Sequence, residues 1–198
     1  MPRMVKTPWS EEEIPFEKAA EIGTKKVIEE HSTIGILVTT DGTITDIPRE
    51  DYIKAEERVV SELKALNKPF VIVLNSYEPN DSKTQELART LADKYTCSVI
   101  PMNCSNLNIE DINTIFSKVL YEFPVERIAI KFPRWIDGLD FNHSLKSELI
   151  NEIKDAFSDI KVLRDVSSCT QKIAKTNIIE NTTVQNIQLG SGFVNIKI

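Results

Sequence analysis

Polar side chains that could bind a ligand follow three apolar segments of the sequence. They lie in 39–46, 75–80 and 103–108. The first of these loops holds Asp41, Gly42 and several threonines, and such hydroxyl and carboxylate oxygens can hold a hydrated cation or the magnesium ion of a phosphate. Their spacing matches no fixed metal motif. The alternative is that Asp41 and Gly42 form a turn and Asp46 lies in solvent, since Asp and Gly are turn residues first.

The second loop begins with Asn75-Ser76-Tyr77-Glu78. It follows an apolar run at the place where GTP-binding proteins carry an Asn-Lys-x-Asp element whose Asp contacts the guanine edge. Here the Lys is absent and Glu replaces the Asp, so guanine selectivity is not indicated. The alternative is that Asn75 hydrogen-bonds its own turn. The third loop begins with Asn103-Cys104-Ser105-Asn106, at the position of the second base-contacting loop of that fold.

Catalysis by other groups finds little support in the residue types. A phosphate-binding loop requires Gly-x-x-x-x-Gly-Lys-[Ser/Thr], and none of the six glycines is followed by a lysine. A Cys–His nucleophile would require folding to bring one of the three cysteines to His31 or His143. Each histidine falls at a predicted helix terminus. A histidine there more often caps the helix or interacts with its dipole than acts in catalysis. We therefore expect no catalytic residue and no metal ligand in this chain.

Apolar segments alternate with amphipathic ones and must position these loops. We expect strands over 34–40, 70–74 and 97–102, and helices over 15–30, 49–66, 82–95 and 109–121. The strand segments are apolar without alternation, which is typical of parallel strands buried on both faces. Strands and helices in alternation predict right-handed βαβ crossovers, and ligands bind beyond the carboxyl ends of such strands. In the helix over 49–66, Glu56, Glu57 and Arg58 are predicted to face solvent.

The first helix, over 15–30, is predicted to pack on one side only. Phe16, Ala19 and Val27 are among the apolar residues that recur there at helical spacing. Acidic residues before Pro15 complement the dipole at the start of this helix.

The alternation changes near residue 123, which divides the chain into a domain over 1–123 and a domain over 124–198. The second is predicted to be a small α+β unit. Its elements are a strand over 125–132, a helix over 144–157, and short antiparallel strands over 177–188 and 192–198. Trp135 is predicted to join its core because large aromatic side chains usually bury, and an exposed contact surface is the alternative.

The composition excludes several classes of protein. The chain has 198 residues, of which 41% are hydrophobic and 27% are charged, as in ordinary globular domains. Scattered basic residues and a net charge of -6 argue against a nucleic-acid partner. No apolar run approaches the roughly 20 residues that span a bilayer, and no signal core follows the first residues. Three cysteines without a Cys-x-x-Cys pair fit a reducing compartment, so we expect a cytoplasmic protein without a transmembrane segment.

Several blocks of residues occur in a fixed order that matches a known family. The blocks include Thr7-Pro8-Trp9, Ala19-Ala20-Glu21-Ile22-Gly23-Thr24, Glu30-His31-Ser32-Thr33-Ile34-Gly35, Thr39-Thr40-Asp41-Gly42-Thr43-Ile44, Lys68-Pro69-Phe70, Leu120-Tyr121-Glu122-Phe123-Pro124-Val125 and Leu163-Arg164-Asp165-Val166. Together they resemble the stage IV sporulation protein A family. The resemblance covers essentially the whole chain and is closest in its first third.

This resemblance implies an activity and a fold. The family comprises ATP-hydrolysing morphogenetic proteins of endospore-forming bacteria, which polymerise around the forespore as the basement layer of the spore coat. Its nucleotide domain resembles translation-factor-related GTPases, and its phosphate-binding loop lies upstream of a segment like 1–9. The family also continues past a segment like the one that ends at Ile198. We therefore expect an internal fragment with an α/β fold, which combines the distal half of a P-loop NTPase-like parallel sheet and its flanking helices with a small α+β unit that begins the middle domain.

The resemblance also implies site residues, cofactors and partners. By position, Thr40, Asp41, Asn75 and Ser76 are expected to line the nucleotide, with ATP and Mg²⁺ as cofactors of the intact protein and none in the fragment. The expected partners are further copies in a polymer, a small amphipathic membrane-anchoring peptide and other coat morphogenetic proteins. The implied location is the mother-cell cytoplasm at the forespore surface, with peripheral membrane association, and later the spore coat.

Two other functions stay open on the sequence alone. A flavodoxin-like binding module, complete as it is, would be monomeric and bind a ligand by itself without hydrolysis. A self-assembly module would polymerise without nucleotide. A sheet without its phosphate-loop strand would also expose an apolar edge that invites self-pairing, and either dimerisation or rearrangement through that edge stays open.

Overall fold

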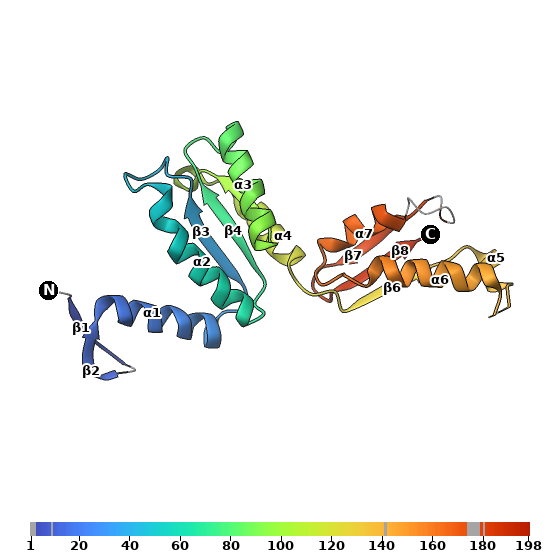
Figure 1. Ribbon diagram of the computed structural model, residues 1–198, viewed down its shortest axis with the longest axis horizontal. Coiled ribbons are helices and arrows are strands. Elements are labelled where there is room, and N and C mark those ends of the chain that lie inside the picture. Colours follow the sequence, from blue (N-terminus) through green and yellow to red (C-terminus); the bar gives the residue numbers. More distant parts are fainter. Residues whose placement is uncertain (1–2, 9, 141, 174–178, 180) are drawn as a thin grey trace. The chain divides into compact units, whose positions relative to one another are not determined.

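Three parallel strands form the centre of the first part of the chain in this computed structural model (Figure 1). They are β3 (Gly35–Thr40), β4 (Phe70–Asn75) and β5 (Val99–Met102), and β4 lies between the other two. The pairing of β3 with β4 is regular from Gly35↔Phe70 to Thr40↔Asn75. The predicted parallel sheet is confirmed. The structure describes residues 3–8, 10–140, 142–173, 179 and 181–198.

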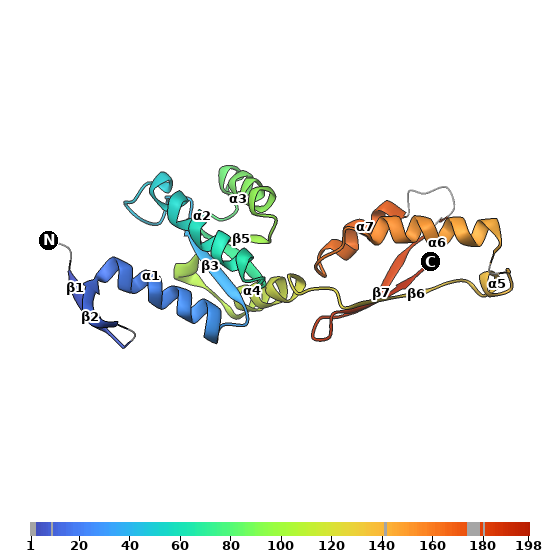
Figure 2. The same cartoon turned by 60° about the horizontal axis from the view of Figure 1, so that its bottom comes forward.

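Two crossover helices cover one face of this sheet, α2 (Arg49–Ala65) and α3 (Ser82–Tyr95), as Figure 2 shows. Their core with the sheet consists of Val60, Leu63, Phe70, Ile72, Leu74, Ala88, Leu91, Tyr95 and Cys97. A Cβ at residue 35 would lie 3.0 Å from Leu63 Cδ2, so glycine at that position lets α2 approach β3 closely. The Asp81 side chain caps α3 by accepting from Lys83 N, which satisfies a free amide of the first turn.

The two strands β3 and β4 differ in burial. β4 is buried along almost its whole length, as predicted. In β3, Ile36 is 43% exposed and Val38 is 58% exposed, so the prediction that this strand is buried on both faces is wrong. The reason is its place in the sheet, since β3 is an edge strand and α2 covers only the side that carries Leu37.

The residues before β3 form a hairpin and a helix. The antiparallel strands β1 (Met4–Thr7) and β2 (Ser10–Pro15) lead into α1 (Phe16–Lys26), which continues as a π-helical segment over Val27–His31. Sequence periodicity missed the hairpin, because the acidic segment before Pro15 is held extended by its pairing with β1. The predicted inner face of α1 is partly wrong. Ala19 is buried, but Phe16 and Val27 are 57% and 56% exposed.

The chain divides into two units, Met1–Ile115 and Phe116–Ile198. This boundary falls inside α4 (Ile109–Tyr121), and the division predicted at residue 123 lies just after that helix. Among the described residues, no helix combines the length and the apolar character needed to cross a membrane.

The second unit contains a three-stranded mixed sheet and helices on one of its sides (Figure 2). The elements are β6 (Arg127–Lys131), α5 (Arg134–Asp137), α6 (Ser144–Phe157), α7 (Asp165–Ile173), β7 (Thr183–Gln188) and β8 (Phe193–Lys197). β8 lies between β6, to which it is parallel, and β7, to which it is antiparallel. The antiparallel pair was predicted, but α7 was not. Of the strand predicted over 177–188, residues 177, 178 and 180 lie outside the described part.

Trp135 lies in the short helix α5 and is 58% exposed. The prediction that it joins the core of the second unit is therefore wrong. The neighbouring Ile136 takes that place and packs with Leu149 and Ile153 of α6. In a helix, adjacent residues point about 100° apart, so burial of Ile136 turns Trp135 toward solvent.

Candidate functional site

The four residues predicted to line a nucleotide come together at the carboxyl edge of the first sheet. Thr40 pairs with Asn75 at the ends of β3 and β4, and Asp41 and Ser76 follow directly. Asp41 N donates to Asn75 O at 3.3 Å, and Ser76 N donates to Met102 O of β5 at 3.0 Å. All three strands therefore deliver polar residues to the same edge, as the parallel topology requires.

The carboxylate of Asp41 ties the first loop to the start of α3. Asp41 Oδ1 accepts from Thr43 N at 3.0 Å and from Thr43 Oγ1 at 2.6 Å, and Asp41 Oδ2 accepts from Thr84 Oγ1 of α3 at 3.0 Å. Burial raises the pKa of Asp41, but hydrogen bonds from Ser76, Thr43 and Thr84 outweigh burial and hold the pKa below its ordinary value of 3.8. Asp41 is therefore an ionised carboxylate whose oxygens already have protein partners.

Asn75 connects the second loop to the third. Its Oδ1 accepts from Cys104 N at 2.9 Å, so the side chain reaches the neighbouring loop and not its own turn. A second bond joins the same two loops, since Asn103 Nδ2 donates to Tyr77 O at 3.3 Å. Tyr77 N in turn donates to Thr43 Oγ1 of the first loop at 2.9 Å. The three loops thus form one hydrogen-bonded platform.

The first loop bends at Gly42, where φ is +92°. Gly42 N donates to Thr40 Oγ1 at 3.0 Å, and Thr40 itself is buried. A Cβ at position 42 would lie 3.3 Å from Arg49 N, so glycine suits this bend for its conformation and its size. Asp46 is exposed, in agreement with the turn interpretation of this segment.

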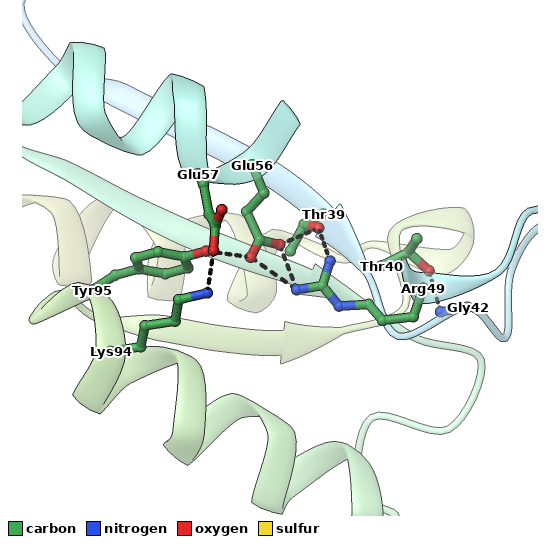
Figure 3. A network of polar contacts seen from close by, with 8 residues as sticks. All are labelled: Thr39, Thr40, Gly42, Arg49, Glu56, Glu57, Lys94 and Tyr95. Carbon is green, nitrogen blue, oxygen red and sulfur yellow. Dashed lines mark hydrogen bonds and ion pairs between the residues drawn. The ribbon is translucent and has the colours of Figure 1, made fainter. Parts of the chain in front are cut away.

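A buried ionic network lies directly beneath this platform, and sequence reasoning missed it (Figure 3). Arg49, at the start of α2, extends its guanidinium between Thr39 of β3 and Glu56 of α2. Its Nη2 lies 2.8 Å from Glu56 Oε1 and 2.7 Å from Oε2, and its Nη1 donates to Thr39 Oγ1 at 3.2 Å. Thr39 Oγ1 donates to Glu56 Oε2 at 2.6 Å, and Tyr95 Oη of α3 donates to Oε1 at 2.8 Å.

Glu56 is only 3% exposed, so its predicted place on the outer face of α2 is wrong. Burial raises the pKa of Glu56, but hydrogen bonds from Arg49, Thr39 and Tyr95 hold it below the ordinary value of 4.5. Burial and the bond to this carboxylate raise the pKa of Tyr95 above 10.0. The signal available in the sequence was Arg49 seven residues before Glu56, a spacing that places opposite charges on one face of a helix.

The network clamps both ends of the first loop. Thr39 is the first residue of the loop, Arg49 follows its other end, and their contacts with Glu56 hold the two ends together. The hydrogen bonds donated to this carboxylate favour its ionised form, in keeping with the lowered pKa of Glu56. The network therefore supports the edge that carries Thr40 and Asp41.

The other chemistry considered from the sequence gains no support from the geometry. Cys97 and Cys169 are buried, and burial raises the pKa of the half-buried Cys104, which disfavours the thiolate that a nucleophile requires. Across the described residues, no group of three or more His, Cys, Asp or Glu side chains is placed to bind a metal ion. The platform is rich in hydroxyl and backbone groups, which suit a polar organic ligand.

A parallel sheet whose carboxyl edge carries tied polar loops defines an α/β protein of the kind that binds ligands at that edge. A model of the ATPase domain of stage IV sporulation protein A matches residues 1–124, and a model of the middle domain of the same protein matches residues 125–198. The chain belongs to the stage IV sporulation protein A family.

Curated relatives agree with this assignment. The chain is 47% identical over 194 residues to stage IV sporulation protein A of Clostridioides difficile (strain 630), and 45% identical over 195 residues to that of Bacillus subtilis (strain 168). Each match covers 98% of this chain and 40% of the relative. The chain thus spans less than half the length of the curated relatives it matches. No solved structure shows a significant match.

Proposed function

We propose that this chain is part of an ATP-hydrolysing morphogenetic protein that polymerises around the forespore and forms the basement layer for spore coat assembly. The observation that carries the proposal is the match of residues 1–124 to an ATPase domain of this family. The residues of the platform add to it, because they lie at the sheet edge where ligands of parallel α/β proteins bind.

In this proposal the platform forms the part of the ATP site beside the base and ribose. Asp41 and Asn75 border it and act by holding the loops in place. Thr40 and Ser76 are 5% and 0% exposed, so they support this part of the site from beneath. The residues do not fit the phosphates, because no glycine of the sequence is followed by lysine and the Asp41 oxygens are occupied by Thr43 and Thr84. Contacts with the phosphates and Mg²⁺ are therefore assigned to residues outside this chain, which by itself is catalytically inactive.

The proposal extends to partners and location through the family. Such a protein would contact further copies of itself, a small amphipathic membrane-anchoring peptide and other coat morphogenetic proteins. It would act in the mother-cell cytoplasm at the forespore surface and remain in the spore coat. The platform supports the nucleotide part of this proposal, and the family assignment alone supports the partners.

A segment exchange tests the proposal. The matching segment of the Bacillus subtilis relative, 45% identical to this chain, is replaced by the chain described here, and ATP hydrolysis and polymer formation by the purified hybrid are measured. We expect both activities to persist. Asn75→Ala in the hybrid is expected to weaken ATP binding, while Asp46→Ala, at the exposed end of the first loop, is expected to leave it unchanged. A folded hybrid that neither hydrolyses ATP nor polymerises would contradict the proposal.

The chain alone gives the second test. Its thermal unfolding is followed during titration with magnesium-ATP, with GTP as control. We expect no saturable rise of the melting temperature, because a ligand stabilises only a protein that binds it. A saturable response to ATP would show a complete site within these residues and would favour the binding module over the fragment of a larger ATPase.

A further inference from the structure

Tyr77 places an aromatic ring on the platform. It is 69% exposed, more than any other aromatic side chain in the described part of the chain. Tyr77 comes after β4, the middle strand of the sheet, so its loop lies between the loops that follow β3 and β5. The ring is therefore presented at the carboxyl edge, where ligands of parallel α/β proteins bind.

The backbone of Tyr77 is fixed from both sides. Its N–H donates to Thr43 Oγ1 of the first loop at 2.9 Å, and its carbonyl oxygen accepts from Asn103 Nδ2 of the third loop at 3.3 Å. The preceding residue, Ser76, is fully buried, and its N–H donates to Met102 O at 3.0 Å. A side chain on such a backbone is preorganised for a ligand, because little further ordering of the loop is needed on binding.

The side chain of Tyr77 differs from those of the other three tyrosines. Tyr52 Oη lies 3.0 Å from Thr45 Oγ1, Tyr95 is 5% exposed, and Tyr121 packs against the core of the second unit. For the phenol oxygen of Tyr77, the described residues supply no hydrogen-bond partner. A largely exposed aromatic ring at a ligand-binding edge has its faces available to the ligand.

We infer that the adenine ring of ATP stacks on the side chain of Tyr77. The polar side chains nearby offer the base little, because the side-chain oxygens of Asp41 and Asn75 already accept hydrogen bonds within the first unit. An aromatic ring binds a base through its π face and needs no such group. The ATPase-domain match over residues 1–124 includes residue 77. Affinity for the base is thus assigned to the Tyr77 ring.

Stacking on Tyr77 supplies affinity for the base and not selectivity between purines. Every base has a π face, so the ring holds adenine and guanine alike. Purines present a larger face than pyrimidines, and the ring therefore favours purine nucleotides.

This inference deepens the nucleotide part of the proposed function and rests on it. The proposed function is tested by ATP hydrolysis and polymer formation in the hybrid with the Bacillus subtilis relative. The role of Tyr77 is tested by how substitutions in that hybrid change its affinity for nucleotide. A hybrid that binds no ATP overturns both, whereas a hybrid that binds ATP equally well without the Tyr77 ring overturns only the inference.

The first measurement is the dissociation constant of the hybrid for a non-hydrolysable ATP analogue, determined by calorimetry. Tyr77→Ala removes the ring and is expected to raise this constant about tenfold. Tyr77→Phe keeps the ring and is expected to bind within about twofold of the parent hybrid. The control is Trp135→Ala, which removes a ring that is 58% exposed in the second unit and should leave the constant unchanged.

Inorganic tripolyphosphate distinguishes a contact with the base from a change in the shape of the site. It resembles the phosphates of ATP but has no base, and its inhibition constant against ATP hydrolysis is measured. Tyr77→Ala is expected to leave this constant unchanged. Because stacking binds substrate and transition state equally, KM for ATP should rise while kcat stays near its parent value. The melting temperature should also stay the same, since an exposed side chain contributes little to stability.

Four results would overturn the inference. Tyr77→Ala binds the analogue as tightly as the parent hybrid, Tyr77→Phe binds it as weakly as Tyr77→Ala, Trp135→Ala weakens it as much, or Tyr77→Ala weakens tripolyphosphate and the analogue equally. Loss of polymer formation in Tyr77→Ala with unchanged nucleotide affinity would belong to the first of these results and would assign the ring to a contact between proteins.

Discussion

Tyr95 Oη donates a hydrogen bond of 2.8 Å to Glu56 Oε1 and so joins the end of α3 to the middle of α2. The carboxylate also accepts from Arg49 and Thr39, and every hydrogen bond reaches it from a different element or a different turn of α2. Buried carboxylates are tolerated only with such partners. The two helices that cover the sheet are therefore held to each other by a polar contact as well as by their apolar core.

The neighbouring residues Glu56 and Glu57 give a matched pair of substitutions. Glu56→Gln removes the charge that Arg49 faces within the protein, and we expect a loss of about 2 kcal/mol in the free energy of unfolding. Glu57→Gln weakens only a surface pair with Lys94, whose two side chains are 50% and 45% exposed, and is expected to cost less than about 1 kcal/mol. Urea unfolding measures both, and equal losses would contradict the network's role.

The pH dependence of stability follows from the same carboxylate. The pKa of Glu56 in the folded chain lies below its ordinary value of 4.5, so folding favours the ionised form. This stabilisation is fully present above pH 4.5 and is lost as the pH falls through the lower folded value. Asp41, whose pKa lies below 3.8, acts in the same direction at still lower pH.

Urea unfolding between pH 7 and pH 3 tests this expectation. The parent chain should lose stability steeply below about pH 4.5. Glu56→Gln should lose less over the same interval because it lacks one of the groups that take up a proton on unfolding. An identical pH profile for the two proteins would show that Glu56 does not have a lowered pKa.

Local sequence patterns predict those parts of the fold that depend on local periodicity. The apolar run over 70–74 and the amphipathic segments on either side of it specify β4 and its two crossover helices. The burial of Glu56 depends instead on donors from residues 39, 49 and 95, which no local window contains. The exposure of Val38 depends on the order of the strands, and parallel strands of any order share the same apolar pattern.

The candidate site likewise has features that the local sequence predicts and others that depend on residues far apart in the chain. The sequence places Thr40, Asp41, Asn75 and Ser76 at strand ends, and the parallel topology alone then brings them to one edge. It does not indicate that Asp41 binds Thr84, which lies 43 residues later. Partners so far apart in the chain are specified by the packing of α3 and not by the residues around Asp41.

The platform is expected to loosen when Asp41 is removed. Asp41→Ala deletes the acceptors of Thr43 and Thr84, and Thr43 Oγ1 in turn holds Tyr77 N. We expect the amides of Thr43 and Tyr77 to exchange about tenfold faster, which corresponds to the loss of roughly 1.4 kcal/mol. Hydrogen exchange followed by NMR measures the exchange rate of each of these amides. Asp46→Ala, in the exposed part of the same loop, should leave both rates unchanged, and a matching effect would refute the proposed tie.

Two glycines of the second unit provide another matched pair. Gly192 has φ +63°, and a Cβ there would lie 2.8 Å from Pro124 O. Gly192→Ala is expected to destabilise the chain by about 1 to 3 kcal/mol, because it adds a steric clash to an unfavourable backbone conformation. Gly190 has open space around its Cβ position, so Gly190→Ala should change stability by less than about 0.5 kcal/mol. Thermal unfolding distinguishes the two, and similar melting temperatures would contradict this reading of residue 192.

The bond between Asn75 and Cys104 is asymmetric in what each residue contributes. Asn75 supplies a side-chain oxygen, whereas Cys104 supplies only its backbone N–H. Any residue except proline can make the Cys104 contribution, but an acceptor oxygen at this distance from the backbone comes only from asparagine or aspartate. Substitutions at position 104 are therefore expected to leave this contact in place and substitutions at position 75, other than by aspartate, to break it, although the two residues meet in the same 2.9 Å contact.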